Sequence, residues 1–73
     1  MDALGIDSFE VNFYSGRALA GLKRHPEAIR RFETALERLP SFGPAYLALA
    51  DSFIATRDLG KAIAVLRRGQ AAS

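Results

Sequence analysis

The chain contains 73 residues, of which 49% are hydrophobic and 25% are charged, with a net charge of +2 and no Cys. This length permits one small domain, and so apolar a composition with so little net charge argues against an intrinsically disordered chain. The absence of Cys excludes a disulfide framework and a thiolate metal site, and the ten dispersed Lys and Arg residues form no nucleic-acid-binding stripe.

Four helical segments are predicted, and the first follows a short N-terminal arm, residues 1–8. Asp7 followed by Glu10 is the arrangement of a helix-capping box, with Ile6 and Val11 placed to form the accompanying hydrophobic staple. Apolar residues continue from this start to about Lys23, and these are Phe9, Val11, Phe13, Leu19 and Leu22.

The second helix opens at His25, with Pro26 in the first helical position, where a missing N–H costs nothing. Its apolar residues recur at steps of three and four and form one stripe, which contains Ala28, Ile29, Phe32, Ala35, Leu36 and Leu39. Glu27 and Arg31 lie four residues apart on the opposite face, in the order that favours an ion pair. Pro40 ends this helix.

The third helix begins after Gly43, with Pro44 in its first turn, and continues to about Thr56. Asp58 is a suitable N-cap for the fourth helix, whose pattern fades at residues 69–73. No segment shows the strict alternation of apolar and polar residues that marks a half-buried strand. The predicted fold class is therefore all-α.

An internal repeat relates the two halves of the chain. When each residue is laid over the one 34 positions later, apolar and small residues coincide: Gly16 on Ala50, Leu19 on Phe53, Ala28 on Ala62, Ile29 on Ile63, Phe32 on Leu66 and Ala35 on Gly69. Small residues at such positions let paired helices approach closely, while the large ones fill the space between them.

This repeat resembles the tetratricopeptide repeat family, whose helix–turn–helix unit has a period of about 34 residues. The second unit reads Tyr46-x-x-Leu49-Ala50-x-x-Phe53, then Ala62-x-x-x-Leu66, and the first reads Asn12-x-x-Ser15-Gly16-x-x-Leu19, then Ala28-x-x-x-Phe32 and Pro40. The first unit departs from the family pattern at Asn12 and Ser15, where the family has bulky apolar residues. The resemblance implies repeats over residues 9–42 and 43–73, which form four antiparallel helices in a short right-handed α-solenoid.

The resemblance also implies a protein–protein interaction module, an adaptor or scaffold, that binds a partly apolar peptide or helix on a concave face. The first helix of each unit lines this face, with Phe13, Arg17, Leu47, Asp51 and Ile54 pointing inward. Two alternatives stay open at these positions. In the first, the apolar side chains pack against one another or against the arm. In the second, Arg17 and Asp51 form a mutual ion pair instead of orienting a polar ligand.

The ends of the predicted array suggest a second function. Repeats bury their cores against neighbouring repeats, so two units leave apolar surface open at both ends. Val11 and Tyr14 on the first helix, and Ile63 and Val65 on the last, are therefore candidates for self-association. The alternatives are a homo-oligomerisation module, a piece of a longer repeat protein and an accessory segment of a larger enzyme.

No catalytic or metal-binding constellation is predicted. His25 is the only His, has no Ser or Cys nucleophile beside it and is interpreted as a turn or capping residue. We therefore predict no enzyme activity, no metal site and no cofactor. The longest purely apolar stretch, residues 45–50, is far shorter than the ~20 residues of a membrane span, and Asp2 stands where a secretory signal needs a base. We expect a cytoplasmic protein that binds neither nucleic acid nor membranes.

Overall fold

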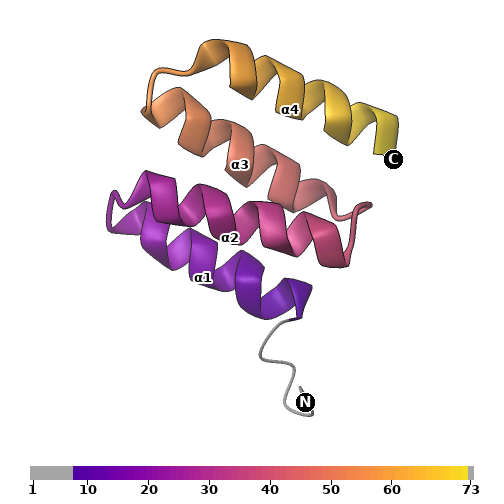
Figure 1. Cartoon of the computed structure of the whole chain (residues 1–73), viewed down its shortest axis with the longest axis horizontal. Helices are drawn as coiled ribbons and strands as arrows, with labels where there is room; N and C mark the ends of the chain where they lie inside the picture. Colours follow the sequence, from indigo (N-terminus) through magenta and orange to yellow (C-terminus); the bar gives the residue numbers. More distant parts are fainter. Residues whose placement is uncertain (1–7, 73) are drawn as a thin grey trace.

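The computed structural model describes residues 8–72, which form four α-helices joined by short turns (Figure 1). In chain order these are α1 (Phe9–Gly21), α2 (His25–Arg38), α3 (Gly43–Ala55) and α4 (Leu59–Ala72). The described residues contain no strand, so the predicted all-α class is confirmed. Each helix packs against the next one along the chain, and α1 also touches α3. As a result, α1 and α4 lie at opposite edges of the stack (Figure 1).

The two helical hairpins close with the same turn. Lys23 between α1 and α2, and Arg57 between α3 and α4, both adopt a left-handed backbone conformation, with φ of 63° and 64°. The N–H of Arg24 donates to the carbonyl of Leu19 at 2.9 Å, and the N–H of Asp58 donates to the carbonyl of Phe53 at 2.8 Å. In both hairpins the acceptor lies five residues before the donor. This is the hydrogen bond of a Schellman helix end. The repeat therefore extends to the backbone of the turns.

The start of α1 differs from the predicted one. Ser8 is the N-cap, and its Oγ accepts the N–H of Val11 at 3.2 Å. Asp7, the predicted cap, lies outside the described residues. Helix α1 ends at Gly21, two residues before the predicted end at Lys23, because the left-handed backbone of Lys23 cannot continue a right-handed helix.

Helix α2 begins and ends where the two prolines predict, but its predicted ion pair is wrong. Glu27 pairs with Arg24, the residue before the helix, with 2.7 Å between Oε1 and Nε. Arg31 donates from Nη1 to Oδ1 of Asn12 on α1, at 3.3 Å. Arg24 competes for Glu27 because it lies three residues away on the same side of the first turn.

Helix α4 is longer than its sequence pattern indicates. Oδ1 of Asp58 accepts the N–H of Lys61 at 3.4 Å, as expected of an N-cap. The helix then continues to Ala72, so the predicted fading from Gly69 is wrong. Gly69 lies directly against α3, where an ideal Cβ on it would be 3.0 Å from Cβ of Tyr46. This close approach packs the last turns of α4 onto α3.

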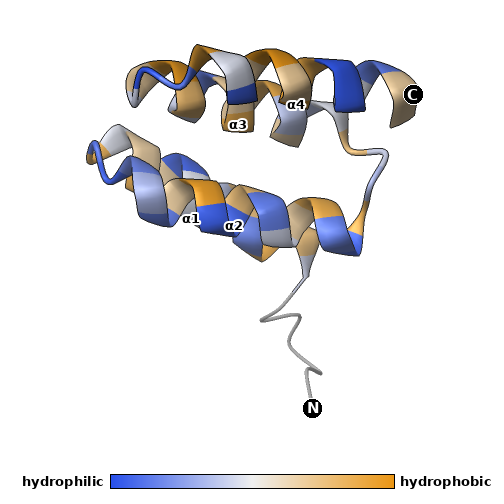
Figure 2. Cartoon of the chain, turned by 45° about the horizontal axis from the view of Figure 1, so that its top comes forward, coloured by the Kyte–Doolittle hydropathy of each residue, from blue (hydrophilic) through white to orange (hydrophobic). Residues whose placement is uncertain are grey.

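The core forms where α1, α2 and α3 meet and continues between α3 and α4. Its buried apolar side chains are Phe13, Ala28, Phe32, Ala35, Leu36, Ala45, Tyr46, Leu49, Ala50, Phe53, Ala62 and Val65. Helix α3, which has neighbours on both sides, is hydrophobic along most of its length, whereas α2 mixes hydrophobic and hydrophilic residues (Figure 2). The small residues predicted at helix contacts, Ala28, Ala50 and Ala62, are all buried.

Phe32 is the centre of the α1–α2 contact. Its side chain is 1% exposed, and an ideal Cβ built on Gly16 of α1 would lie 2.6 Å from its Cε1 atom. The predicted close approach at Gly16 is therefore confirmed. Phe13 packs beside Phe32, with 6.0 Å between ring centroids, and meets Phe42 edge-on at 4.9 Å. These rings fill the space that the glycine leaves between the helices.

A hydrogen bond from Tyr46 ties α3 to the loop before it. The phenol of Tyr46 donates to the carbonyl of Pro40 at 2.6 Å, and the ring is 6% exposed. We expect Tyr46→Phe to lower the free energy of unfolding by about 1 kcal/mol, because the Pro40 carbonyl loses its partner. Urea denaturation followed by circular dichroism measures this change. Tyr14→Phe is the matched control, since the Tyr14 ring is 60% exposed, and an equal loss in both variants would contradict the prediction.

Candidate interaction surfaces

One pocket lies on the face shared by α1 and α3 and has a volume of about 230 Å³. We name it the concave pocket, and its lining residues are Arg17, Ala20, His25, Phe32, Ala48, Asp51 and Ser52. Arg17 from the first repeat and Asp51 from the second line the same cavity, as their 34-residue spacing suggested. The pocket therefore combines an apolar floor with one basic and one acidic side chain.

The two charged groups of the concave pocket do not pair with each other. The guanidinium carbon of Arg17 lies 5.8 Å from the ring centroids of both Phe13 and Tyr14 on α1. Such stacking on aromatic faces holds an Arg side chain without neutralising its charge. Within residues 8–72, Asp51 is exposed and takes part in no ion pair. Both charges thus remain available at the rim of one cavity.

The structure adds two polar residues to this pocket that the sequence pattern does not indicate. Nδ1 of His25 lies 3.5 Å from Oγ of Ser52, a contact that joins the start of α2 to α3. Ser52 is only 1% exposed, so the contact supplies a partner for a buried hydroxyl. Helix α2 begins at His25, as predicted, and Arg24 holds the N-cap position, so His25 is neither a turn residue nor the cap.

The predicted concave-face residues separate into different environments. Phe13 is 7% exposed and lies among the rings of Phe32 and Phe42, so its assignment to a partner-binding face is wrong. Ile54 is 50% exposed on α3. Leu47 is 62% exposed but lines a second, larger pocket.

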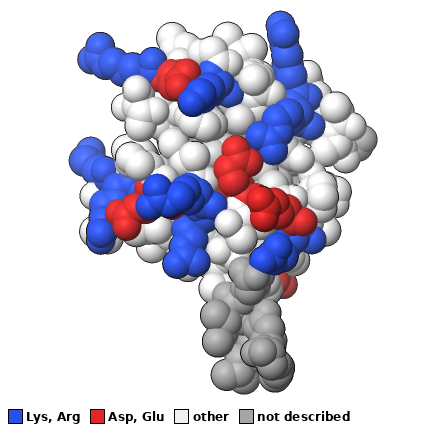
Figure 3. All heavy atoms as spheres, viewed as in Figure 1, with Lys and Arg blue, Asp and Glu red and all other residues white. Residues whose placement is uncertain are grey.

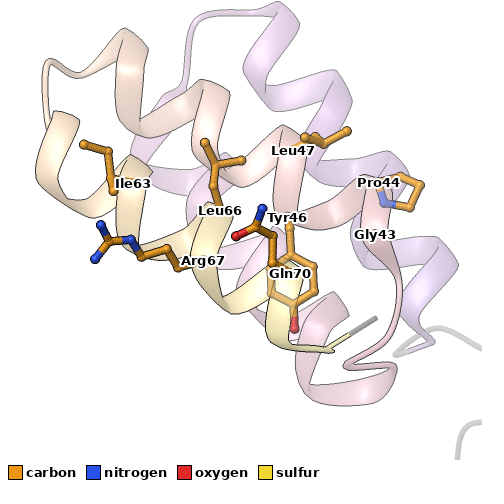
Figure 4. Close-up of a pocket in the computed structure, with 9 residues that line it drawn as sticks. Gly43, Pro44, Tyr46, Leu47, Ile63, Leu66, Arg67 and Gln70 are labelled. Carbon is orange, nitrogen blue, oxygen red and sulfur yellow. The ribbon is translucent and has the colours of Figure 1, made fainter.

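This second pocket, which we name the end groove, lies on the outer side of α3 and α4 and has a volume of about 700 Å³ (Figure 4). Its lining residues are Gly43, Pro44, Tyr46 and Leu47 from α3, with Ile63, Leu66, Arg67, Gly69 and Gln70 from α4. The side chains of Ile63 and Leu66 are 53% and 40% exposed. An exposed apolar groove of this size is typical of a surface that binds another protein segment.

The four self-association candidates differ in how far they are exposed. Val11, Tyr14 and Ile63 are 40%, 60% and 53% exposed, as predicted for uncovered repeat ends. Val65 is 3% exposed and belongs to the core, so its prediction is wrong. Its neighbour Leu66 is exposed instead, although its counterpart Phe32 is buried. The reason is that α3 packs onto α2, whereas none of the described helices packs onto the outer side of α4.

Charged side chains of both signs are interspersed on the visible face of the molecule (Figure 3). One ion pair links the two hairpins, with 3.3 Å between Nη2 of Arg68 on α4 and Oε1 of Glu33 on α2. Among the described residues, no three His, Asp or Glu side chains come together as metal ligands. No helix in the same range is both long and apolar enough to cross a membrane.

Comparison with protein families identifies the family of this chain. A tetratricopeptide repeat family model matches residues 19–73, a range that covers α2, α3, α4 and the last residues of α1. The match leaves out Asn12 and Ser15, the two residues at which the first unit departs from the family pattern. No curated protein and no solved structure matches the chain.

Proposed function

The chain belongs to the tetratricopeptide repeat family, and from this we propose that it is a protein-interaction module without catalytic activity, built of repeats over residues 9–42 and 43–73. Tetratricopeptide repeats in general bind other proteins. The specific proposal is that the concave pocket, together with the exposed Ile54 about one helical turn after Asp51, binds an extended peptide or a helix of a partner protein. The observation that carries it is that Arg17 and Asp51, two opposite charges, line one cavity and form no ion pair with each other.

The charges define the chemistry of the partner segment. Arg17 is placed to donate hydrogen bonds to a carboxylate or carbonyl, and Asp51 to accept them from a basic side chain or a backbone N–H. The exposed Ile54 offers an apolar contact beside them. A segment with one apolar anchor flanked by polar groups of both signs meets all three requirements, and the two charges fix its direction.

Selection from a library of random peptides displayed on phage tests this proposal. Peptides that bind the chain are expected to lose about tenfold in affinity on Asp51→Lys, because a charge-assisted hydrogen bond is replaced by repulsion. Fluorescence polarisation of labelled peptides measures the affinity. Glu37→Lys is the control, since the side chain of Glu37 is 71% exposed on α2, outside the concave pocket.

The outcome of the selection is decisive in either direction. Enriched peptides whose binding depends on Asp51 and Arg17 and not on Glu37 support the concave pocket as the binding site. Failure to enrich any peptide, or enriched peptides that bind equally to the Asp51→Lys and Arg17→Glu variants, contradicts it.

A further inference from the structure

The end groove has a filled counterpart inside the chain. A residue-by-residue comparison of α2 with α4 shows eight positions more exposed on α4 than on α2, and four of them recur along one side of the helix. On α2 they are Ile29, Phe32, Glu33 and Leu36, and on α4 they are Ile63, Leu66, Arg67 and Gln70. This spacing of three, four and seven residues defines one face of a helix. Helix α3 packs against α2, where Phe32 of this face lines one pocket with Ala48 and Ser52 of α3, and on α4 all four residues line the end groove.

The same comparison of α1 with α3 identifies the surface that fits such a groove. Five positions are more buried on α3 than on α1, and four of them again have a spacing of three, four and seven residues. On α3 they are Ala45, Ala48, Leu49 and Ser52, and on α1 they are Val11, Tyr14, Ser15 and Ala18. On α3 this is the face that meets the preceding hairpin. We name its counterpart on α1 the docking face.

We propose that the docking face of one copy of the chain binds the end groove of a second copy, as α3 binds α2 within the chain. Each copy then continues the stack of the other, and the contact repeats the geometry that already joins the two hairpins. This proposal does not rest on the concave pocket, which lies on the face shared by α1 and α3.

Side-chain volumes support this pairing. In the groove, Leu66 replaces Phe32 and Gly69 replaces Ala35, so the groove is wider than its filled counterpart. On the docking face, Val11 and Tyr14 replace Ala45 and Ala48 with larger side chains. A contact tolerates such exchanges when gains in volume are offset by losses, and here Tyr14 in place of Ala48 is offset in part by Leu66 in place of Phe32 and by Ser15 in place of Leu49. Ala48 and Phe32 line one pocket within the chain, so the register brings Tyr14 of one copy to Leu66 of the other.

The pairing also determines the form of the assembly. The docking face and the end groove belong to helices at opposite edges of the stack (Figure 1). When two copies bind in this way, one docking face and one end groove remain free at the two ends of the dimer. Further copies can bind there, so association continues beyond the dimer. The mean mass is therefore expected to rise steadily with concentration instead of levelling at two chains.

Sedimentation velocity of the full 73-residue chain and of two variants tests the proposal. Leu66→Glu places a charge in the end groove, and Tyr14→Glu places one on the docking face. Each variant is expected to weaken self-association by roughly tenfold or more, because a carboxylate must be desolvated in the contact. Both residues are exposed in the single chain, so circular dichroism should show unchanged helix content.

Mixing the two variants supplies the decisive result. The Leu66→Glu chain keeps an intact docking face and the Tyr14→Glu chain keeps an intact groove, so an equimolar mixture should form dimers of twice the 7.9 kDa chain mass and nothing larger. Ala64→Glu changes an exposed α4 residue outside both surfaces, whose counterpart Arg30 is also exposed on α2, and this variant should associate like the original chain.

Three results would overturn the proposal. The first is an original chain that stays monomeric up to millimolar concentration, as expected if the groove accepts a different helix. The second is a dimer that survives Tyr14→Glu, which indicates that two end grooves pair with each other. The third is a mixture of the two variants that forms no dimer. In none of these cases is peptide binding at Asp51 affected, so the two proposals fail separately.

Discussion

Phe32→Ala is expected to lower the free energy of unfolding by about 3–5 kcal/mol, the usual cost of removing a fully buried aromatic ring. Phe32 is 1% exposed and fills the space over Gly16, so its loss leaves a cavity between α1 and α2 that neither backbone can close. A chain of this length has a total stability of about 4–11 kcal/mol, and the variant is therefore expected to be largely or partly unfolded at 37 °C. Urea denaturation at low protein concentration measures the change without a contribution from self-association.

The internal repeat supplies the matched control for this substitution. Leu66 occupies the equivalent position of the second repeat but is 40% exposed, so Leu66→Ala should cost about 1–2 kcal/mol, below the usual range for a buried leucine. Equal losses in Phe32→Ala and Leu66→Ala would mean that the burial of Phe32 by α1 and α3 contributes nothing to stability.

Gly16→Val is the second substitution with a large expected effect. The new Cβ would lie 2.6 Å from Cε1 and 2.7 Å from Cδ1 of Phe32, so this buried ring must shift from its packed position. Overpacking of this kind costs about 2–3 kcal/mol, and it exceeds the gain of a few tenths that a valine gives over glycine within a helix. Thermal and urea denaturation are expected to show the loss together.

Gly60→Val on α4 makes the same chemical change where no atom lies within 4 Å of the added Cβ. We expect the stability of this variant to differ from that of the original chain by less than about 0.5 kcal/mol. If Gly60→Val destabilises the chain as strongly as Gly16→Val does, the effect comes from the β-branched side chain and not from contact with Phe32.

The order and bounds of the helices could be predicted from the sequence because local chemistry determines them. Pro26 and Pro44 are tolerated only in the first turn of a helix, and in the structure both lie there. The 34-residue register predicted that the equivalent residues Ala28 and Ala62 lie in helix contacts, and both are buried. The end of α4 was missed because its last turns are held by contact between Gly69 and Tyr46, which lie far apart in the sequence.

The candidate site was harder to predict because exposure depends on neighbours that are not adjacent in the chain. Val65 and Leu66 are consecutive apolar residues, and only the packing of α4 on α3 decides that the first is buried and the second exposed. Phe13 was assigned to the concave face by analogy of position, but three aromatic rings surround it. The prediction of an ion pair between Glu27 and Arg31 was wrong for a similar reason. Arg24, which precedes the helix, forms the ion pair with Glu27 instead.

The order in which the helices meet also determines how the chain reaches this structure. Because α4 packs against α3, and α3 against α2, every major contact joins segments that are consecutive in the sequence. Each contact then closes a short loop and costs little chain entropy, a topology associated with folding in microseconds to milliseconds. Among the described helices, α4 packs against α3 alone, and the Arg68–Glu33 ion pair ties it to α2. We therefore expect α4 to detach and rebind while α1 and α2 remain folded.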